Sequence, residues 1–514
     1  MTGLARSYDY VVVGGGTGGA VVAARLATES DAAVLLIEAG PDDAGIADIA
    51  APARWASLLG GAYDWNYAYA PSPRVDGRSI PIPRGRVLGG SSSINAMLWY
   101  RGHPADYDRW AEAGCSGWSF AEVLPFFKKA EDWEGGADAW RGAGGPMRIS
   151  RSPDPHPVAR AMLEGSAELG LPVIDDPNGA SNEGAALSNL NVSDGKRWSV
   201  VDGYLRPAAG RKNLTILTGS AALRLGFAGG RCVSVTHLLG DKVVETEARQ
   251  SVVLALGAFD TPRLLMLSGI GEPAALRALG ITVRAALPGV GQNLQDHPLL
   301  MGMNFAAAAP LGPVRDNGGG GMINWKSRPD LGQPDLHAFV VQGRHAGPEV
   351  AEDYDLSGHL FALSPGLMHS KSRGYLRLLG DEPQSPLEIQ PNYLAEPEDL
   401  AALIASMDFI MDLAETAPFR ALGARPAAPD RRLAEAGKAR FVRRSLATFF
   451  HPSGTCAMGT GPEAVVDPRL RVHGIEGLAI ADASVIPTIP TCNTQAPVVM
   501  IAERAAQFLL EEAA

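Results

Sequence analysis

The sequence predicts a mixed α/β fold that is divided between at least two domains, and three observations support this prediction. An apolar run at residues 8–13 is followed by the glycine cluster 14–19 and by an alanine-rich stretch with the composition of a helix. A second apolar run, residues 33–37, ends at the acidic Glu38. The chain has 514 residues, which is too long for one compact hydrophobic core.

The order of strand, glycine turn, helix, strand and acid is that of a Rossmann-type unit that binds a dinucleotide. In such a unit Gly14 permits the sharp turn, Gly16 lets the backbone approach a pyrophosphate, and Gly19 allows the helix to pack closely on the strand. The start of the helix offers backbone N–H groups and a positive dipole end to the phosphates. Glu38 follows at the spacing expected for an acid that binds a ribose hydroxyl. These residues therefore predict a dinucleotide site.

The composition is that of a soluble metabolic enzyme. A net charge of −11 at pH 7 argues against nucleic acid or an anionic membrane surface as the main partner. Apolar residues make up 46% of the chain, yet no apolar stretch approaches the length of a transmembrane helix. Residues 1–7 are too few for a signal peptide, so a cytoplasmic location is expected. The four cysteines have no paired spacing, and no cluster of ligand residues predicts a metal site.

Two further apolar segments are typical of strands that end at a cofactor. Residues 252–256 lead to Gly257, and residues 477–481 lead to Asp482. In flavoproteins that hold an extended FAD, a strand-terminal aspartate of this kind accepts a hydrogen bond from a ribityl hydroxyl. A simple NAD-binding unit has no need of such a segment, so the sequence favours FAD over NAD. The alternative interpretation of Asp482 is a residue that caps a turn or a helix.

The rest of the chain alternates between strand and helix patterns. Residues 213–256 contain short strands, and residues 299–399 contain strands with glycine-rich gaps, as in a mixed antiparallel sheet. The predicted helices are residues 261–267, 397–416, 430–446 and 497–510.

Five stretches of the sequence resemble the signatures of the glucose–methanol–choline (GMC) oxidoreductase family. In chain order, they are residues 85–95, 257–271, 289–298, 451–459 and 493–497. The resemblance extends over nearly the whole chain. It implies a FAD-binding domain that is assembled from separated segments, a second α+β domain that binds substrate on a mixed or antiparallel sheet, and an active site beside the flavin ring.

The resemblance also implies how the chain is divided. A run rich in Gly, Pro, Ser and Asp at residues 135–155 suggests a crossing between domains. The expected FAD-binding domain comprises residues 1–155, 210–298 and 447–514, and its last part carries the catalytic residues. The expected substrate domain comprises residues 156–209 and 299–446.

The Rossmann-type unit and the resemblance together define the residues that are expected to bind FAD. Family members that bind FAD covalently use a histidine at the position of Ile94, and an isoleucine cannot form that bond, so a non-covalent FAD is expected. The expected cofactor residues are Gly14, Gly16, Thr17, Gly19, Glu38, Ala39, Trp65, Arg86, Gly89, Gly90, Ser91, Asn95, Ala96, Met97, Ala222, Ala255, Gly257, Asp482, Ala483, Asn493 and Thr494.

The resemblance implies that His451 is a general base and that Asn493 is its partner. Oxidation of an alcohol removes a hydroxyl proton and a carbon-bound hydride; the flavin accepts the hydride, and a neutral imidazole can accept the proton. The helix that begins near Thr494 would direct its positive end toward the reduced flavin. The plainer interpretation of Asn493 is a helix cap. The histidines expected to be structural or surface residues are His297, His337, His345, His359 and His369.

The function that follows is FAD-dependent oxidation of an alcohol, by an oxidase or a dehydrogenase. Phe339, Phe361 and Phe450 are candidate pocket residues that suit a primary aromatic or medium-chain alcohol, although each could equally belong to the core. Hydroxynitrile lyases and light-driven fatty-acid decarboxylases are similar to the same family and remain alternatives. These motifs leave open the electron acceptor, dioxygen or a quinone, and the oligomeric state.

Overall fold

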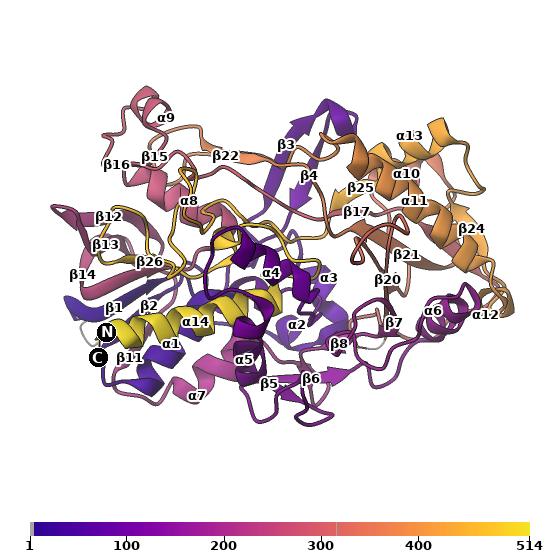
Figure 1. Cartoon of the computed structure of the whole chain (residues 1–514), viewed down its shortest axis with the longest axis horizontal. Helices are drawn as coiled ribbons and strands as arrows, with labels where there is room; N and C mark the ends of the chain where they lie inside the picture. The colour runs from indigo at the N-terminus through magenta and orange to yellow at the C-terminus, as the bar shows by residue number, and fades with distance from the viewer. Residues whose placement is uncertain (1–4, 315, 514) are drawn as a thin grey trace.

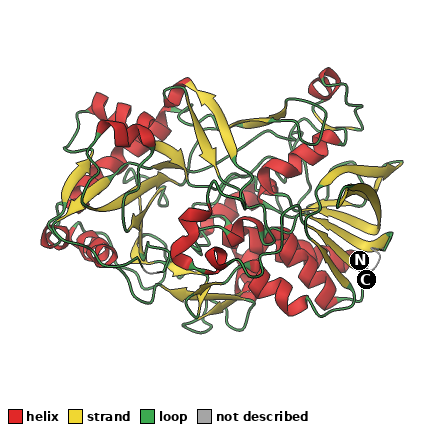
Figure 2. Ribbon diagram, turned by 180° about the vertical axis from the view of Figure 1, so that it is seen from behind, coloured by secondary structure: helices red, strands yellow, loops and turns green. Residues whose placement is uncertain are grey.

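The structure, a computed structural model, describes residues 5–314 and 316–513. Two large β-sheets lie toward opposite ends of the molecule, and helices and loops lie between them (Figure 1). Viewed from behind, the first sheet lies close to both ends of the chain (Figure 2). The mixed α/β fold predicted from the sequence is confirmed.

The first sheet contains the predicted Rossmann-type unit, whose helix is α1 (Thr17–Glu29). Its central strands run parallel, and Val12 pairs with Leu36 on one side and with Val253 on the other. All three side chains are fully buried, which explains why these strands are continuous apolar runs. Across the sheet the strands are β11 (Leu214–Leu217), β2 (Val34–Ile37), β1 (Ser7–Val13), β14 (Lys242–Leu254), β13 (Arg231–Leu239) and β12 (Ala222–Ala228), and β26 (Leu478–Ile480) also pairs with β14.

The turn after β1 brings two parts of the backbone into close contact. Gly14 has a φ of +99°, and a Cβ atom there would lie 2.5 Å from the carbonyl oxygen of Ala255. A Cβ atom on Gly19 would lie 1.8 Å from the carbonyl oxygen of Gly14. Only glycine fits at either position. The predicted roles of Gly14 in the turn and of Gly19 in the packing of α1 are therefore confirmed.

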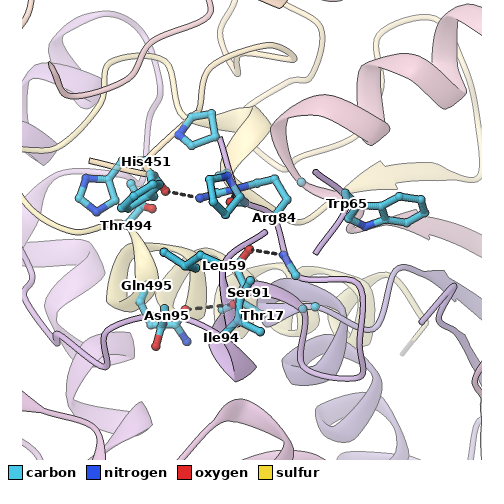
Figure 3. A pocket seen from close by; sticks show the side chains of 18 of the residues that line it. Thr17, Leu59, Trp65, Arg84, Ser91, Ile94, Asn95, His451, Thr494 and Gln495 are labelled. Carbon is cyan, nitrogen blue, oxygen red and sulfur yellow. Dashed lines mark hydrogen bonds between the residues drawn. The ribbon is translucent and has the colours of Figure 1, made fainter. Parts of the chain in front are cut away.

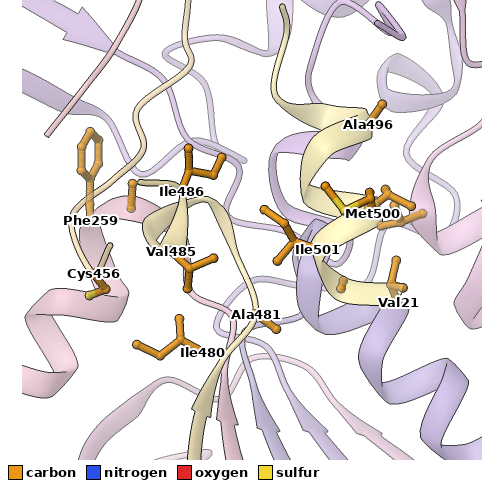
Figure 4. Close-up of a cluster of buried hydrophobic side chains, with 14 of the residues drawn as sticks. Val21, Phe259, Cys456, Ile480, Ala481, Val485, Ile486, Ala496, Met500 and Ile501 are labelled. Carbon is orange, nitrogen blue, oxygen red and sulfur yellow. The ribbon is translucent and has the colours of Figure 1, made fainter. Parts of the chain in front are cut away.

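The last described helix, α14 (Gln495–Ala513), packs against α1 although the two are far apart in sequence. Figure 4 shows Met500 and Ile501 of α14 beside Val21 of α1. Arg25 on α1 forms an ion pair of 2.7 Å with the buried Glu503 on α14. This pairing holds the start of α14 next to the glycine turn.

The second sheet has eight strands and is antiparallel. The helices α11 (Pro397–Ala414) and α6 (Pro157–Glu168) pack against it. Its main path runs through β24 (Arg425–Ala428), β18 (Asn304–Ala307), β21 (His359–Leu367), β20 (Leu336–Val341), β19 (Gly321–Trp325) and β7 (Gly184–Leu187), and β17 (Pro298–Leu300) and β25 (Leu446–Thr448) join it beside β21.

Smaller elements connect and flank the two sheets. The segment 135–155, expected to be a crossing, contains a strand, β6, that pairs with β5 and β8. The helix expected at 430–446 begins later, at Glu435. The other main elements are β3 (Tyr67–Ser72), β4 (Arg78–Ile82), α4 (Pro104–Glu112), α5 (Phe120–Ala130), β5 (Glu131–Trp133), β6 (Met147–Arg151), β8 (Asn189–Leu190), α7 (Arg206–Ala208), α8 (Gly257–Leu267), α9 (Pro273–Ala278), α10 (Pro348–Asp353), β22 (Tyr375–Leu378), β23 (Leu387–Gln390), α12 (Ala417–Ala421) and α13 (Glu435–Ser445).

The segment 156–209, expected to belong to the substrate domain, is divided between the two ends of the molecule. Its first part supplies α6 and β7 to the second sheet, whereas the helical turn Val201–Leu205 packs on α1. The boundaries of the domains stay a prediction.

Candidate active site

A cavity of about 880 Å³ lies between the two sheets. It extends from the glycine turn after β1 to His451, which follows β25, and it also reaches Phe339 on β20. Figure 3 shows side chains from distant parts of the chain around it, among them Thr17, Trp65 and His451. Most residues expected to bind FAD line this cavity: Gly14, Gly16, Thr17, Glu38, Ala39, Trp65, Arg86, Gly90, Ser91, Asn95, Ala96, Ala222, Ala255, Gly257, Asp482, Ala483, Asn493 and Thr494.

Three of the expected cofactor residues, Gly19, Gly89 and Met97, are not among those that line the cavity, and their contact with FAD stays a prediction. Gly19 faces the strand instead. The backbone N–H of Gly89 donates to the carbonyl oxygen of Gly15 at 2.8 Å, which ties the second glycine cluster to the first. Met97 is fully buried in an apolar cluster with Tyr100 and its neighbours.

Glu38 shapes the end of the cavity at the Rossmann-type unit. Its carboxylate accepts hydrogen bonds from the backbone N–H groups of Gly15 at 2.8 Å and Gly40 at 2.7 Å. Burial raises the pKa of Glu38 to about 7, although both hydrogen bonds act in the opposite direction. Glu38 therefore orders the glycine turn, in addition to the ribose contact predicted for it.

The residues at this end fit FAD. A Cβ atom on Gly90 would lie 2.8 Å from the Cα atom of Gly16, so the two glycine clusters pack backbone against backbone at the cavity wall, with no side chains between them. Thr17 donates to the Oε1 atom of Gln495 at 3.1 Å, and the buried Nε2 atom of Gln495 has no partner among the described residues. An unused donor at the start of α14 suits an acceptor on a bound cofactor. Ile94 also lines the cavity and offers no nucleophile for a covalent flavin bond.

Asp482 has protein partners for both of its carboxylate oxygens. It accepts hydrogen bonds from the Gly257 N–H at 2.9 Å, from the Thr261 hydroxyl at 2.6 Å and from the Ser484 N–H at 2.8 Å. The last bond caps the short helix Ala483–Val485. The capping interpretation of Asp482 is thus confirmed, and its contact with a ribityl hydroxyl stays a prediction.

At the other end of the cavity, His451 and Asn493 meet. The side-chain amide nitrogen of Asn493 lies 3.0 Å from Nε2 of His451. Because an amide nitrogen only donates, this contact is a hydrogen bond to an unprotonated Nε2 atom. The phenyl ring of Phe449 stacks on the imidazole of His451, with ring centroids 5.2 Å apart. The sequence signatures thus identified two side chains that the fold brings into direct contact.

A second histidine contacts His451 and was missed by the sequence analysis. The Nδ1 atoms of His297 and His451 are 2.9 Å apart, although the residues are separated by 154 positions. The strands explain the contact: Pro298 of β17 pairs with Thr448 of β25, so His297 and the residues after β25 lie side by side. The one available signal was the place of His297 in the stretch 289–298.

His451 is neutral at physiological pH. Burial is the main reason that its pKa lies well below the ordinary value for histidine, and the nearby His297, Arg84 and His337 lower it further. Arg84 lines the cavity and donates to the carbonyl oxygen of Phe450 at 2.6 Å. The arrangement is a neutral imidazole with an unprotonated Nε2 atom at the wall of a cavity, which can accept a proton.

The cavity beside His451 is largely apolar. Phe339, Phe449 and Phe450 line it. Phe361 does not, because it points into the core of the second sheet, where it stacks between Phe305 and Phe419; the prediction for Phe361 is wrong.

Acidic side chains are confined to the cofactor end of the cavity. Among the described residues, those that line it are Glu38, Asp260 and Asp482. Asp260 accepts hydrogen bonds from Tyr67 at 2.7 Å and from Arg263 at 2.9 Å. Each of the three acids already has protein donors, so none is free to pair with a cationic substrate.

Three other observations concern metal binding, cysteines and membrane crossing. Residues 5–314 and 316–513 contain no group of His, Cys, Asp and Glu side chains arranged to hold a metal ion. The four cysteines are buried and unpaired. In the same residues, no helix combines the length and the apolar character that a membrane crossing requires.

His337 allows a test of how burial near the cavity lowers the pKa of a histidine. Its Nδ1 atom contacts the Asn324 side chain at 2.7 Å, and burial lowers its pKa to about 3. Between that value and 6.5 the unfolded chain binds a proton that the folded chain does not, so stability is lost as the pH falls through 6.5. At pH 5.5 the loss is about 1.4 kcal/mol relative to pH 7.5.

We therefore expect His337→Asn to reduce the pH dependence of the unfolding free energy by about this amount. Denaturant unfolding at pH 7.5 and 5.5, followed by tryptophan fluorescence, measures it. The matched control is His359→Asn, which makes the same exchange at an exposed position on β21. An unchanged difference for His337→Asn would show that the pKa of this histidine is the same in the folded and the unfolded protein.

Comparison with known proteins agrees with the geometry. Models of the N-terminal and C-terminal parts of GMC oxidoreductases match residues 8–299 and 370–502. The chain is 36% identical to an oxygen-dependent choline dehydrogenase of Brucella anthropi, over 98% of this chain and 95% of that protein. It is 38% identical to the mitochondrial choline dehydrogenase of Homo sapiens, over 98% of this chain and 89% of that protein.

Solved structures show the same relationship. Pyridoxine 4-oxidase from Mesorbium loti superposes with a TM-score of 0.92 at 35% identity, over 97% of this chain and 98% of that one. A formate oxidase superposes with a TM-score of 0.90 at 28% identity, over 98% of both chains. The protein therefore belongs to the GMC oxidoreductase family and is a FAD-dependent oxidoreductase that acts on CH–OH groups.

Proposed function

We propose that the protein oxidises a neutral, largely apolar primary alcohol to the aldehyde, with His451 as the general base. The observation that carries this proposal is the contact of Asn493 with Nε2 of His451 at the cavity wall, together with the lowered pKa of His451. The imidazole is unprotonated and faces the cavity before a substrate binds, which is the state that a base requires.

The reaction divides between the cofactor and the chain. FAD bound in the cavity supplies the acceptor for the hydride. Nε2 of His451 takes the hydroxyl proton of the alcohol. The amide of Asn493 exchanges its hydrogen bond with His451 for one to the substrate oxygen, which holds the oxygen beside the base. The contact of the Nδ1 atoms of His451 and His297 fixes the orientation of the His451 ring, so that its Nε2 atom faces the substrate.

The shape and charge of the cavity support an apolar, uncharged substrate. Phe339, Phe449 and Phe450 form its wall near His451. The carboxylates at the cofactor end are bonded to the protein, and the exposed Arg344 adds a positive charge at the cavity. A quaternary ammonium group would meet aromatic rings but no balancing carboxylate, and it would be repelled by Arg344.

The proposed substrate differs from choline, which the choline dehydrogenase relatives are named for. It is closer in character to the substrate of an enzyme such as pyridoxine 4-oxidase, whose name indicates an aromatic pyridine ring. We expect kcat/KM for benzyl alcohol or 1-hexanol to exceed that for choline by at least about tenfold, since one unpaired charge in an apolar site costs more than 1.4 kcal/mol.

The test is anaerobic mixing of the FAD-loaded enzyme with benzyl alcohol, 1-hexanol and choline, followed by the absorbance of oxidised flavin. Bleaching by the neutral alcohols supports the proposal. Faster bleaching by choline would contradict the substrate class. Cleavage of mandelonitrile without bleaching would instead identify a hydroxynitrile lyase, and light-dependent loss of carbon dioxide from a fatty acid would identify a decarboxylase. Reoxidation by dioxygen or by a soluble quinone then reveals the electron acceptor.

A further inference from the structure

A single buried carboxylate holds the backbone of both histidines. One oxygen of Asp296, Oδ1, accepts a hydrogen bond from the backbone N–H of His297 at 2.8 Å and another from the backbone N–H of His451 at 2.8 Å. Asp296 is 3% exposed and does not line the cavity. It therefore acts on the two segments that carry the imidazoles and touches neither ring.

The other oxygen of Asp296 is held by three hydroxyl groups. Tyr69 on β3 donates to Oδ2 at 2.6 Å, Tyr393 after β23 donates at 2.7 Å, and Thr448 at the end of β25 donates at 2.5 Å. Five donors from separate parts of the chain thus converge on one carboxylate. Such a group has almost no freedom to move, because each displacement would break several charge-assisted hydrogen bonds.

The backbone that Asp296 holds is strained. Phe450, between the end of β25 and His451, has a φ of +69°, which is rare for a bulky side chain. The backbone N–H of Phe450 donates to the hydroxyl of Thr448 at 2.7 Å, and that hydroxyl donates to Asp296. The next N–H, that of His451, donates to Asp296 directly. The turn is kept in an unfavourable conformation by bonds that lead to this one carboxylate.

We propose that Asp296 is a positioning residue that fixes the backbone on both sides of the His297–His451 pair and thereby sets where Nε2 of His451 meets the alcohol. The inference rests on the proposed function of His451 as the base. Without Asp296 the strained turn relaxes, and the imidazole moves away from the substrate oxygen while the rest of the cavity stays intact. Because a displacement of about 1 Å can cost roughly a hundredfold in rate, the effect should fall on turnover rather than on binding.

The matched control is Asp399, a second buried aspartate with several donors. It accepts hydrogen bonds from the hydroxyl groups of Ser370 and Ser372 and from the N–H groups of Lys371 and Ser372, and it is 1% exposed. Its partners lie in one loop, and neither histidine is among them. Loss of Asp399 should lower stability to a similar degree and leave chemistry alone.

The experiment compares Asp296→Ala, Asp296→Asn and Asp399→Ala as FAD-loaded enzymes, with benzyl alcohol as the probe substrate. We expect Asp296→Ala to lower kcat by at least about thirtyfold with KM changed by less than about threefold. Asp296→Asn should recover most of the rate, because its carbonyl oxygen can still accept from both backbone N–H groups. Asp399→Ala should lower the Tm but keep kcat within about twofold of the wild type. Equal losses of kcat in Asp296→Ala and Asp399→Ala, normalised to bound FAD, would overturn the inference.

A double-mutant cycle with His451→Ala separates the inference from the proposed function. If Asp296 acts through His451, Asp296→Ala should slow the His451→Ala enzyme by less than about threefold. If the His451→Ala enzyme is fast, the proposed base is wrong. If it is slow and Asp296→Ala slows it by a further thirtyfold, the positioning role is wrong.

If Asp296→Ala does not fold, Thr448→Val replaces it, because this variant removes the hydroxyl that joins Phe450 to Asp296. A kcat equal to that of the wild type would then contradict the inference.

Discussion

Replacement of His451 by alanine should lower kcat by at least about a hundredfold while FAD stays bound. Among the described residues that line the cavity, His451 is the histidine whose unprotonated nitrogen contacts Asn493. Its removal leaves the hydroxyl proton without an acceptor and removes a stacking partner of Phe449. The hydrogen-bond partners of His451 are Asn493, His297 and Asp296, which lie outside the glycine turn. Anaerobic stopped-flow reduction of the flavin by benzyl alcohol measures the effect on the chemical step.

The control for this variant is His359→Ala, because His359 is exposed and lies on β21. It should reduce flavin at the wild-type rate. If His451→Ala bleaches the flavin within about threefold of the wild-type rate, the base must be sought among other groups.

The pH profile provides a second measurement on the same residue. A base works only while it is unprotonated, and the pKa of His451 lies well below the ordinary value because the group is buried. Turnover should therefore stay constant from about pH 9 down through pH 6.5, the ordinary pKa of histidine, and decline only in more acidic solution. A decline centred on pH 6.5 would indicate an imidazole in contact with water.

Replacement of Glu38 by alanine should weaken FAD binding by more than about tenfold and slow the chemistry of the remaining loaded enzyme much less. The carboxylate accepts hydrogen bonds from Gly15 and Gly40, and it is expected to accept another from the ribose. Loss of two charge-assisted hydrogen bonds to the turn, at about 1.5 kcal/mol or more each, disorders the backbone that would hold the pyrophosphate.

Fluorescence titration of the apoprotein with FAD measures this affinity. Glu38→Gln should lose less than Glu38→Ala, since its amide oxygen can still accept one of the two backbone bonds. Asp42→Ala removes an exposed acid from the same loop and should leave the affinity unchanged. An unaltered FAD affinity in Glu38→Ala would show that the glycine turn is ordered by the sheet alone.

The sequence predicted the elements whose signal is local. The Rossmann-type unit was evident because strand, turn and helix follow one another within residues 7–38. The contact between His451 and Asn493 was predicted from signatures, whereas Asp296 and His297 were not given roles. Their contacts with the turn at His451 join residues that are more than 150 positions apart in the sequence, and these contacts depend on the pairing of β17 with β25. A polar residue that acts through another residue's backbone leaves no periodic pattern in a sequence.

The wrong prediction that Phe361 lines the cavity has a similar explanation. Phe361 lies on β21, which is buried along almost its whole length and on both faces, so no alternation of polar and apolar residues indicates which face meets the cavity. Arg197, also overlooked, is 3% exposed and donates to the side-chain oxygen of Asn95 at 2.8 Å. A buried arginine is rare enough to be noticed in a structure, but in a sequence it is indistinguishable from a surface cation.

The pairing of α14 with α1 has a consequence for how the protein matures. The wall of the cavity beside the glycine turn is finished only when Thr494, Gln495 and the helix after them have emerged from the ribosome and docked. A nascent chain that already contains the whole nucleotide-binding motif still lacks a closed compartment for the prosthetic group. We therefore expect tight flavin binding only after α14 has been translated and has docked on α1.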